Sequence, residues 1–103
     1  MHEGAVVRVR GGTKEGRPGV VLRVFRNDDN TLMVFVPWGT GTPRDEPQVV
    51  IQPRTAAGTA LGIYKTTYFR RANVTVCAAD KVELYGVNCP PREMIALKAL
   101  FGL

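Results

Sequence analysis

Short segments in which apolar and polar residues alternate fill the first three quarters of this 103-residue chain. Alternation with a period of two places successive side chains on opposite faces of a β-strand. The pattern predicts six strands, at residues 4–10, 20–26, 31–36, 49–52, 64–70 and 72–77. Strands this short and this closely spaced predict a mainly β fold, a small twisted barrel.

Turn-forming residues separate the predicted strands. Residues 11–19 and 37–47 contain several Gly and Pro residues and are predicted to be long loops. The Asn-Asp-Asn-rich turn at 27–30 joins the second and third strands, so the first three strands are expected to form an antiparallel meander. In the first strand the alternation leaves one wet face, which carries Val6, Arg8 and Arg10. Residues 55–62 are predicted as a loop or one helical turn, and residues 80–84 as a short helix.

The end of the chain has the spacing of an amphipathic helix. Met94, Leu97 and Phe101 recur at i, i+3 and i+7, and Gly102 provides a stop. Paired prolines suit the opening turn, where a missing N–H costs little, and Glu93 complements the positive end of the helix dipole. The length corresponds to one domain, residues 1–103, and its small core favours a homodimer that buries additional apolar area.

The distribution of charge favours a polyanionic partner. The chain carries 14 Lys and Arg against 9 Asp and Glu, a formal net charge of +5. Residues 1–75 hold 11 of the cations and 6 of the acids, whereas residues 76–103 hold three of each, so the excess lies on the strand-rich part. Hydrophobic residues at 45% and charged residues at 22% are typical of a globular chain, so the positive charge is expected on a folded surface that attracts nucleic acid.

Several classes of function are disfavoured by what the sequence lacks. One histidine and two distant cysteines, Cys77 and Cys89, do not make a zinc site, so no metal is expected. The glycines lack the spacing of a nucleotide-binding loop, so no cofactor is expected. No apolar run approaches the roughly 20 residues of a membrane span, and the first residues lack the pattern of a signal peptide. With too few cysteines for a disulfide framework, the chain is expected to be cytoplasmic.

Cations beside aromatic rings are expected in proteins that bind single-stranded nucleic acid, because cations hold phosphates and rings stack on bases. The candidate RNA-binding residues are Lys14 and Arg44 in the two long loops, Trp38 beside a glycine, and Arg70 after an aromatic pair. Two alternatives stay open. Solvated strand faces also carry charge, and the aromatic residues at 68–69 also suit a small core.

Arg17 and Thr40 are the candidate catalytic residues. RNA carries its own nucleophile, the 2′-OH beside the scissile phosphate, so an enzyme can cleave it by aligning that oxygen and stabilising the added negative charge. The planar guanidinium of Arg17, in the segment Gly-Arg-Pro-Gly, suits phosphate oxygens because it donates two parallel hydrogen bonds. A hydroxyl from the segment Gly-Thr-Gly-Thr, Thr40 or alternatively Thr42, can orient the same group.

In three stretches the chain resembles the MazF/PemK toxins of toxin–antitoxin systems. The first is Arg-Pro-Gly-Val-Val-Leu at 17–22, and the second is Met-Val-Phe-Val-Pro at 33–37, which leads to Thr40. The third runs from Tyr-Phe-Arg at 68–70 through Asp-Lys-Val at 80–82 to Met94 and the final Gly-Leu. The resemblance spans nearly the whole chain in the same order.

This resemblance implies an SH3-like barrel with a C-terminal helix, a homodimer, and a metal-independent endoribonuclease that cuts single-stranded RNA. It also implies a cognate antitoxin that silences the toxin by occupying the RNA groove. The family's catalytic arginine corresponds to Arg17 and its threonine to Thr40, with Thr42 as a substitute.

Two other classes of function remain as alternatives. Residues 7–24 are similar to the KOW motif, a barrel segment that binds RNA without cutting it. A divergent inactive member or a gyrase-directed member of the same barrel superfamily is a third possibility. The last four residues, Leu-Phe-Gly-Leu, lack the tryptophan expected of a gyrase-directed protein.

Overall fold

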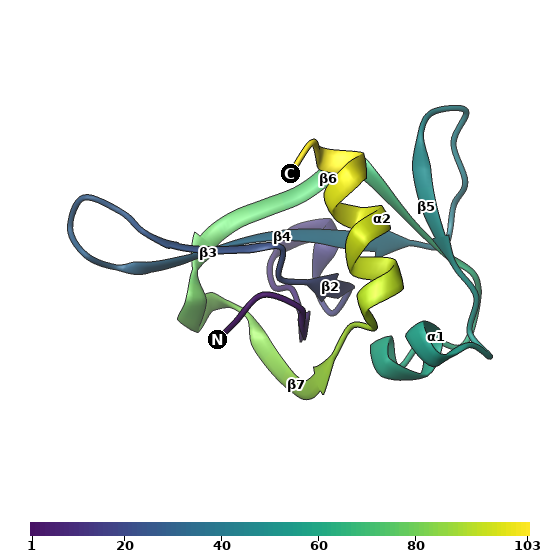
Figure 1. Ribbon diagram of the computed structural model, residues 1–103, viewed down its shortest axis with the longest axis horizontal. Helices are drawn as coiled ribbons and strands as arrows, with labels where there is room; N and C mark the ends of the chain where they lie inside the picture. The colour runs from purple at the N-terminus through teal and green to yellow at the C-terminus, as the bar shows by residue number, and fades with distance from the viewer.

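Seven strands form one antiparallel sheet that curls into a half-barrel in the computed structural model, which describes all 103 residues (Figure 1). The strands are β1 (Ala5–Arg8), β2 (Pro18–Val20), β3 (Arg23–Arg26), β4 (Leu32–Thr40), β5 (Gln48–Ile51), β6 (Thr67–Ala78) and β7 (Glu83–Asn88). The helices are α1 (Ala56–Leu61) and α2 (Pro91–Phe101), and the 3-10 turns are η1 (Gly12–Lys14) and η2 (Ala79–Lys81). The predicted mainly β, barrel-like fold with a C-terminal helix is confirmed.

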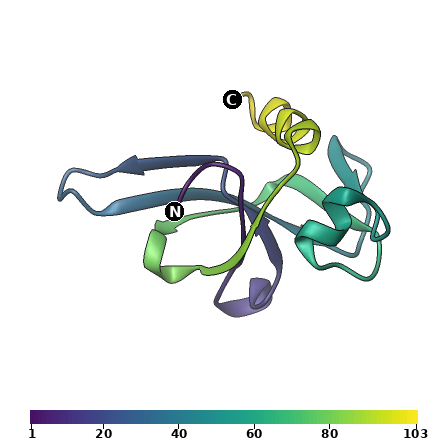
Figure 2. The same ribbon diagram turned by 60° about the horizontal axis from the view of Figure 1, so that its bottom comes forward.

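The order of strands across the sheet is β5-β6-β4-β2-β1-β7, and β3 pairs with β4 outside this path. Strands β4 and β6 pair along most of their length, from Met33 opposite Ala78 to Thr40 opposite Tyr68. The β3–β4 hairpin projects from one end of the molecule, and α1 lies at the other end (Figures 1 and 2). Strands β2 and β4 are therefore interior, whereas β5 and β7 are the two ends of the path.

The predicted strand at 20–26 is wrong as a single element. The chain leaves β2 after Val20, and β3 begins at Arg23, because the first part pairs with β1 and the second part pairs with β4. The two segments predicted at 64–70 and 72–77 are instead one long strand, β6, which begins only at Thr67, so the prediction of a strand at residues 64–66 is wrong. The expected helix at 80–84 is also wrong, since a 3-10 turn there leads directly into β7.

The predicted loop at 37–47 begins too early, because β4 continues through Pro37 and Trp38 to Thr40. Proline lacks the N–H that a strand uses for pairing and is tolerated at irregularities of the ladder. The register of β4 against β6 shifts between Pro37 and Gly39, which accommodates the proline. Strand β4 therefore extends into the Gly-Thr-Gly-Thr segment and includes the candidate catalytic residue Thr40.

The core consists of two clusters that share β1. Val6 packs in a cluster with residues of both helices, including Leu61 and Leu97. Val7 and Val9 pack in a second cluster with Val21, Val34 and Val36. The expected wet face of the first strand is therefore wrong at Val6, which is fully buried, because helices cover that face of the sheet.

Helix α2 has the predicted extent and ends. It begins at Pro91, and Gly102 closes it in the left-handed conformation, with φ of +71°. Leu97 is fully buried, and the ring of Phe101 meets the ring of Phe35 edge-on at 5.4 Å between centroids. Neither α1 nor α2 has the length and apolar character that crossing a bilayer requires.

Candidate active site

A pocket of about 380 Å³ opens where the residues before β2 meet the end of β4. Its walls come from β1, the loop before β2, the end of β4 and the segment between α1 and β6. The lining residues are Arg8, Glu15, Gly16, Arg17, Pro18, Gly39, Thr40, Gly41, Gly62, Ile63, Tyr64, Lys65 and Thr67. Both candidate catalytic residues are among them.

Pairing of the two interior strands brings Arg17 and Thr40 together. Gly19 of β2 lies opposite Trp38 of β4 in an antiparallel ladder. Arg17, two residues before Gly19, and Thr40, two residues after Trp38, therefore lie on the same side of this pair and line the same pocket. The backbone of Arg17 is also held at the end of β1, because its carbonyl accepts a hydrogen bond of 3.1 Å from the Val9 N–H.

Glycine at two positions lets the strands meet closely beneath the pocket. A Cβ at Gly39 would lie 2.2 Å from Cγ2 of Thr67, and a Cβ at Gly19 would lie 2.7 Å from Cγ1 of Val36. Real Cβ atoms do not approach other atoms so closely, so neither position has room for a side chain. The close approach keeps Thr40 and the neighbouring strand β6 in one fixed arrangement.

Arg8 and Lys65 add positive charge to the pocket beside Arg17. The guanidinium of Arg8 lies over the ring of Tyr85, with its Cζ 3.9 Å from the ring centroid. Its Nη2 donates a hydrogen bond of 2.6 Å to the Leu61 carbonyl at the end of α1, where the helix dipole is negative. These contacts fix Arg8 without an acidic partner, so the pocket keeps its positive charge.

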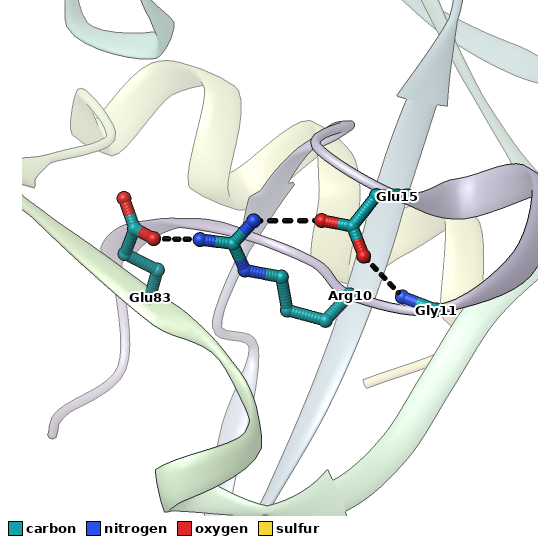
Figure 3. Close-up of polar contacts among 4 residues, drawn as sticks. All are labelled: Arg10, Gly11, Glu15 and Glu83. Carbon is teal, nitrogen blue, oxygen red and sulfur yellow. Dashed lines mark hydrogen bonds and ion pairs between the residues drawn. The ribbon is translucent and has the colours of Figure 1, made fainter.

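Glu15 is the one carboxylate that lines the pocket. Its oxygens accept hydrogen bonds from Arg10 Nη1 at 2.6 Å and from the Gly11 N–H at 2.8 Å, while Arg10 Nη2 donates to Glu83 of β7 (Figure 3). The hydrogen bond from Arg10, followed by that from Gly11, lowers the pKa of Glu15 below its ordinary value. Glu15 is therefore an anion at neutral pH, fastened at the edge of a cationic pocket.

Tyr64 extends from the rim of the pocket and is 88% exposed. It and the other lining residues Arg8, Glu15 and Lys65 are absent from the candidates chosen by sequence. Tyr64 is followed directly by Lys65, which is the same signal of an aromatic residue beside a cation that drew attention to Arg70. That signal could have found this segment.

The other candidates lie outside the pocket. Lys14 lines a separate hollow of about 250 Å³, and Thr42 and Arg44 lie exposed in the loop after β4. Trp38 packs partly buried against the second core cluster, with its indole nitrogen enclosed and unpartnered. Arg70 pairs with Glu46 at 3.0 Å, and its side chain is 14% exposed.

Of the hydroxyl candidates, the structure brings Thr40 and not Thr42 to the pocket. Thr40 Oγ1 makes a long contact of 3.4 Å with the carbonyl of Thr42, so its hydroxyl has no strong internal partner. No three His, Cys, Asp or Glu side chains come together as a group that could hold a metal ion.

Comparisons of the chain with models of known protein families, with curated proteins and with solved structures give no match. The resemblance to the MazF/PemK toxins therefore rests only on the three sequence stretches that carry it.

Proposed function

We propose that this protein is a metal-independent endoribonuclease that cleaves single-stranded RNA. The observation that carries the proposal is that Arg17 and Thr40 line one pocket, which they share with the further cations Arg8 and Lys65. A pocket with three cations and one anion attracts a phosphodiester, and RNA is the polymer that brings its own nucleophile to the phosphate.

The proposed reaction is an in-line attack of the ribose 2′-oxygen on the adjacent phosphorus. A bond forms between the 2′-oxygen and phosphorus, and the bond from phosphorus to the 5′-oxygen breaks. The products are a 2′,3′-cyclic phosphate and a 5′-hydroxyl end. Arg17 stabilises the extra negative charge of the phosphorane, and the Thr40 hydroxyl donates to a phosphate oxygen.

The proton of the 2′-OH needs an acceptor, and we assign it to the carboxylate of Glu15. This assignment follows from its ionised state and its place in the lining. Arg17 does not fill this role because a guanidinium donates hydrogen bonds and has no acceptor atom. Glu15 then returns its proton to water, and the 5′-oxygen that leaves on the opposite side of phosphorus takes a proton from water.

We propose further that the protein acts in the cytoplasm as the toxin of a toxin–antitoxin system, as a homodimer bound by an antitoxin. The support is the family resemblance, together with apolar side chains that the single chain leaves in water. Leu84 and Val87 of β7 are 55% and 43% exposed, and Ile95 of α2 is 72% exposed. A second copy or an antitoxin that covers them would add buried apolar area.

The test is incubation of the purified protein with a long single-stranded RNA in the presence of a metal chelator, followed by mapping of the RNA ends. We expect fragments with 2′,3′-cyclic phosphate and 5′-hydroxyl ends, and arrested growth of cells that express the chain alone. Intact RNA, or fragments with 3′-hydroxyl ends, would contradict the proposal.

A non-catalytic RNA-binding module of the KOW type is the second candidate. The observation that favours it is the involvement of Glu15 with Arg10, which makes the carboxylate a weak base. This candidate predicts RNA binding that weakens steeply with salt and no new RNA ends with any variant.

A further inference from the structure

The segment between α1 and β6 holds Tyr64 in water although the residues on both sides are anchored. Ile63 packs against the first core cluster, and its N–H donates to the Gly58 carbonyl at 3.2 Å. Thr66 donates to the side chain of Gln52 at 2.7 Å. The backbone on both sides of Tyr64 is thus anchored, yet the residue is 88% exposed, so the lost backbone freedom is not offset by burial of the ring.

Tyr64 shares the pocket lining with Arg17 and is followed directly by Lys65. A planar ring beside cations, on a backbone anchored on both sides, is the arrangement that stacks on a nucleobase while cations hold the phosphates. No other aromatic side chain lines the pocket. The exposed ring of Phe25 belongs to the β3–β4 hairpin and does not reach it.

We propose that Tyr64 is the base-stacking subsite of this pocket and holds an unpaired nucleobase next to the phosphate bound by Arg17 and Lys65. The ligand class is single-stranded nucleic acid, and the contact is to the face of the base, so it tolerates different bases. The inference rests on the proposed function for its ligand. It does not require that the protein cut what it binds.

The experiment measures binding of an eight-nucleotide 2′-O-methyl RNA, which lacks the nucleophile, by fluorescence anisotropy over a series of salt concentrations. Tyr64→Ala is expected to raise Kd by about tenfold or more and to leave the salt dependence of binding unchanged, because stacking releases no counterions. Tyr64→Phe, which keeps the ring, is expected to bind within about twofold of the parent protein. Lys65→Ala is expected to lower the salt slope by about one.

A cycle with an altered ligand makes the test specific. Each nucleotide of the RNA is replaced in turn by an abasic residue. At one position this replacement is expected to weaken binding to the parent protein and to leave binding to Tyr64→Ala unchanged. Phe25→Ala removes an exposed aromatic ring outside the pocket and is the matched control, with an unchanged Kd.

The subsite is overturned if Tyr64→Ala binds as tightly as Tyr64→Phe, if no abasic position depends on Tyr64, or if the oligonucleotide does not bind. A protein that cuts RNA but shows no Tyr64 effect loses the subsite alone. A protein that stacks a base on Tyr64 but produces no new RNA ends loses the nuclease proposal alone. If a partner protein buries Tyr64 while the abasic cycle is flat, the ring is a protein contact and the subsite is wrong.

Discussion

Arg10 holds the carboxylate of Glu15 with its Nη1 at 2.6 Å and reaches Glu83 with its Nη2, so one guanidinium ties the loop before β2 to the edge strand β7. The sequence places Arg10 and Glu83 more than seventy residues apart, yet β1 and β7 pair and bring them together. This contact sets both the position and the protonation of the carboxylate that lines the pocket.

The first prediction concerns pH. Because hydrogen bonds from Arg10 and Gly11 lower the pKa of Glu15, its anion persists to lower pH than that of an ordinary glutamate, and so does activity that needs the anion. The same lowered pKa contributes stability above the unfolded-state value, which is lost as pH falls through the folded-state value. Arg10→Ala is expected to move the acid limb of the cleavage rate upward in pH. The control Arg92→Ala, which removes an exposed arginine outside the pocket, is expected to leave the acid limb in place. An unmoved acid limb in Arg10→Ala would exclude Glu15 as the proton acceptor.

Arg17→Ala is expected to lower the cleavage rate by about 100-fold or more, as the loss of one preorganised charge-stabilising donor does. RNA affinity is expected to change only a few fold, because Arg8 and Lys65 stay in the pocket. The measurement is the single-turnover rate at saturating protein beside the Kd for a 2′-O-methyl RNA. A similar rate in Arg17→Ala and the Arg92→Ala control would show that Arg17 is not catalytic.

The two hydroxyl candidates can be separated by removing each hydroxyl. Thr40→Val keeps the shape of the side chain and is expected to lower the cleavage rate at least tenfold, whereas Thr40→Ser restores most of it because the hydroxyl returns. Thr42→Val is expected to have no effect, since Thr42 lies outside the pocket. The opposite ranking of the two valine variants would transfer the role to Thr42.

Gly39→Ala is expected to destabilise the fold by about 1–3 kcal/mol, because the new Cβ overlaps Cγ2 of Thr67. Thr67→Ser removes that methyl group, so the double variant should recover part of the loss. Contacts of 3.1 Å with Phe69 remain and limit the recovery. Urea unfolding of the two single variants and the double variant measures the coupling, and additive losses would contradict the close approach.

The two free cysteines are expected to react at very different rates. Burial raises the pKa of Cys89 to about 12, and the side chain is 5% exposed, whereas Cys77 is partly exposed. In the folded protein a maleimide at pH 8 should modify Cys77 first, and Cys89 should react only in denaturant. Mass spectrometry of the modified peptides reports the order, and early modification of Cys89 would mean that α2 opens readily.

The end helix could be predicted from sequence because local rules decide it, and Arg17 and Thr40 could be singled out as candidates, although the strand pairing that brings them to one pocket is long-range. Apolar spacing and Gly102 define α2, and the Arg-Pro and Gly-Thr segments stand out by their composition. The wrong elements have long-range causes. The break after Val20 and the strand at 83–88 depend on which partner each segment pairs with, and alternation within a segment does not report the partner.

The same limit applies to the pocket. Arg8 is unremarkable in the sequence, as one of several charged residues in a strand, and its role depends on Tyr85 and on the end of α1. Arg70 stands out beside its aromatic neighbours in the sequence, yet its guanidinium forms an ion pair with Glu46. Composition identifies the cations, and only the packed chain shows which of them have acidic partners.

Because β2 and β4 are interior to the sheet, other strands flank the pairing of Gly19 with Trp38, beside which Arg17 and Thr40 lie. Thr40 belongs to the interior strand β4, whereas Arg17 and Glu15 belong to the loop before β2, which hydrogen bonds from Val9 and Arg10 hold in place. The pocket of this small chain is thus held by strand pairing on one side and by loop hydrogen bonds on the other.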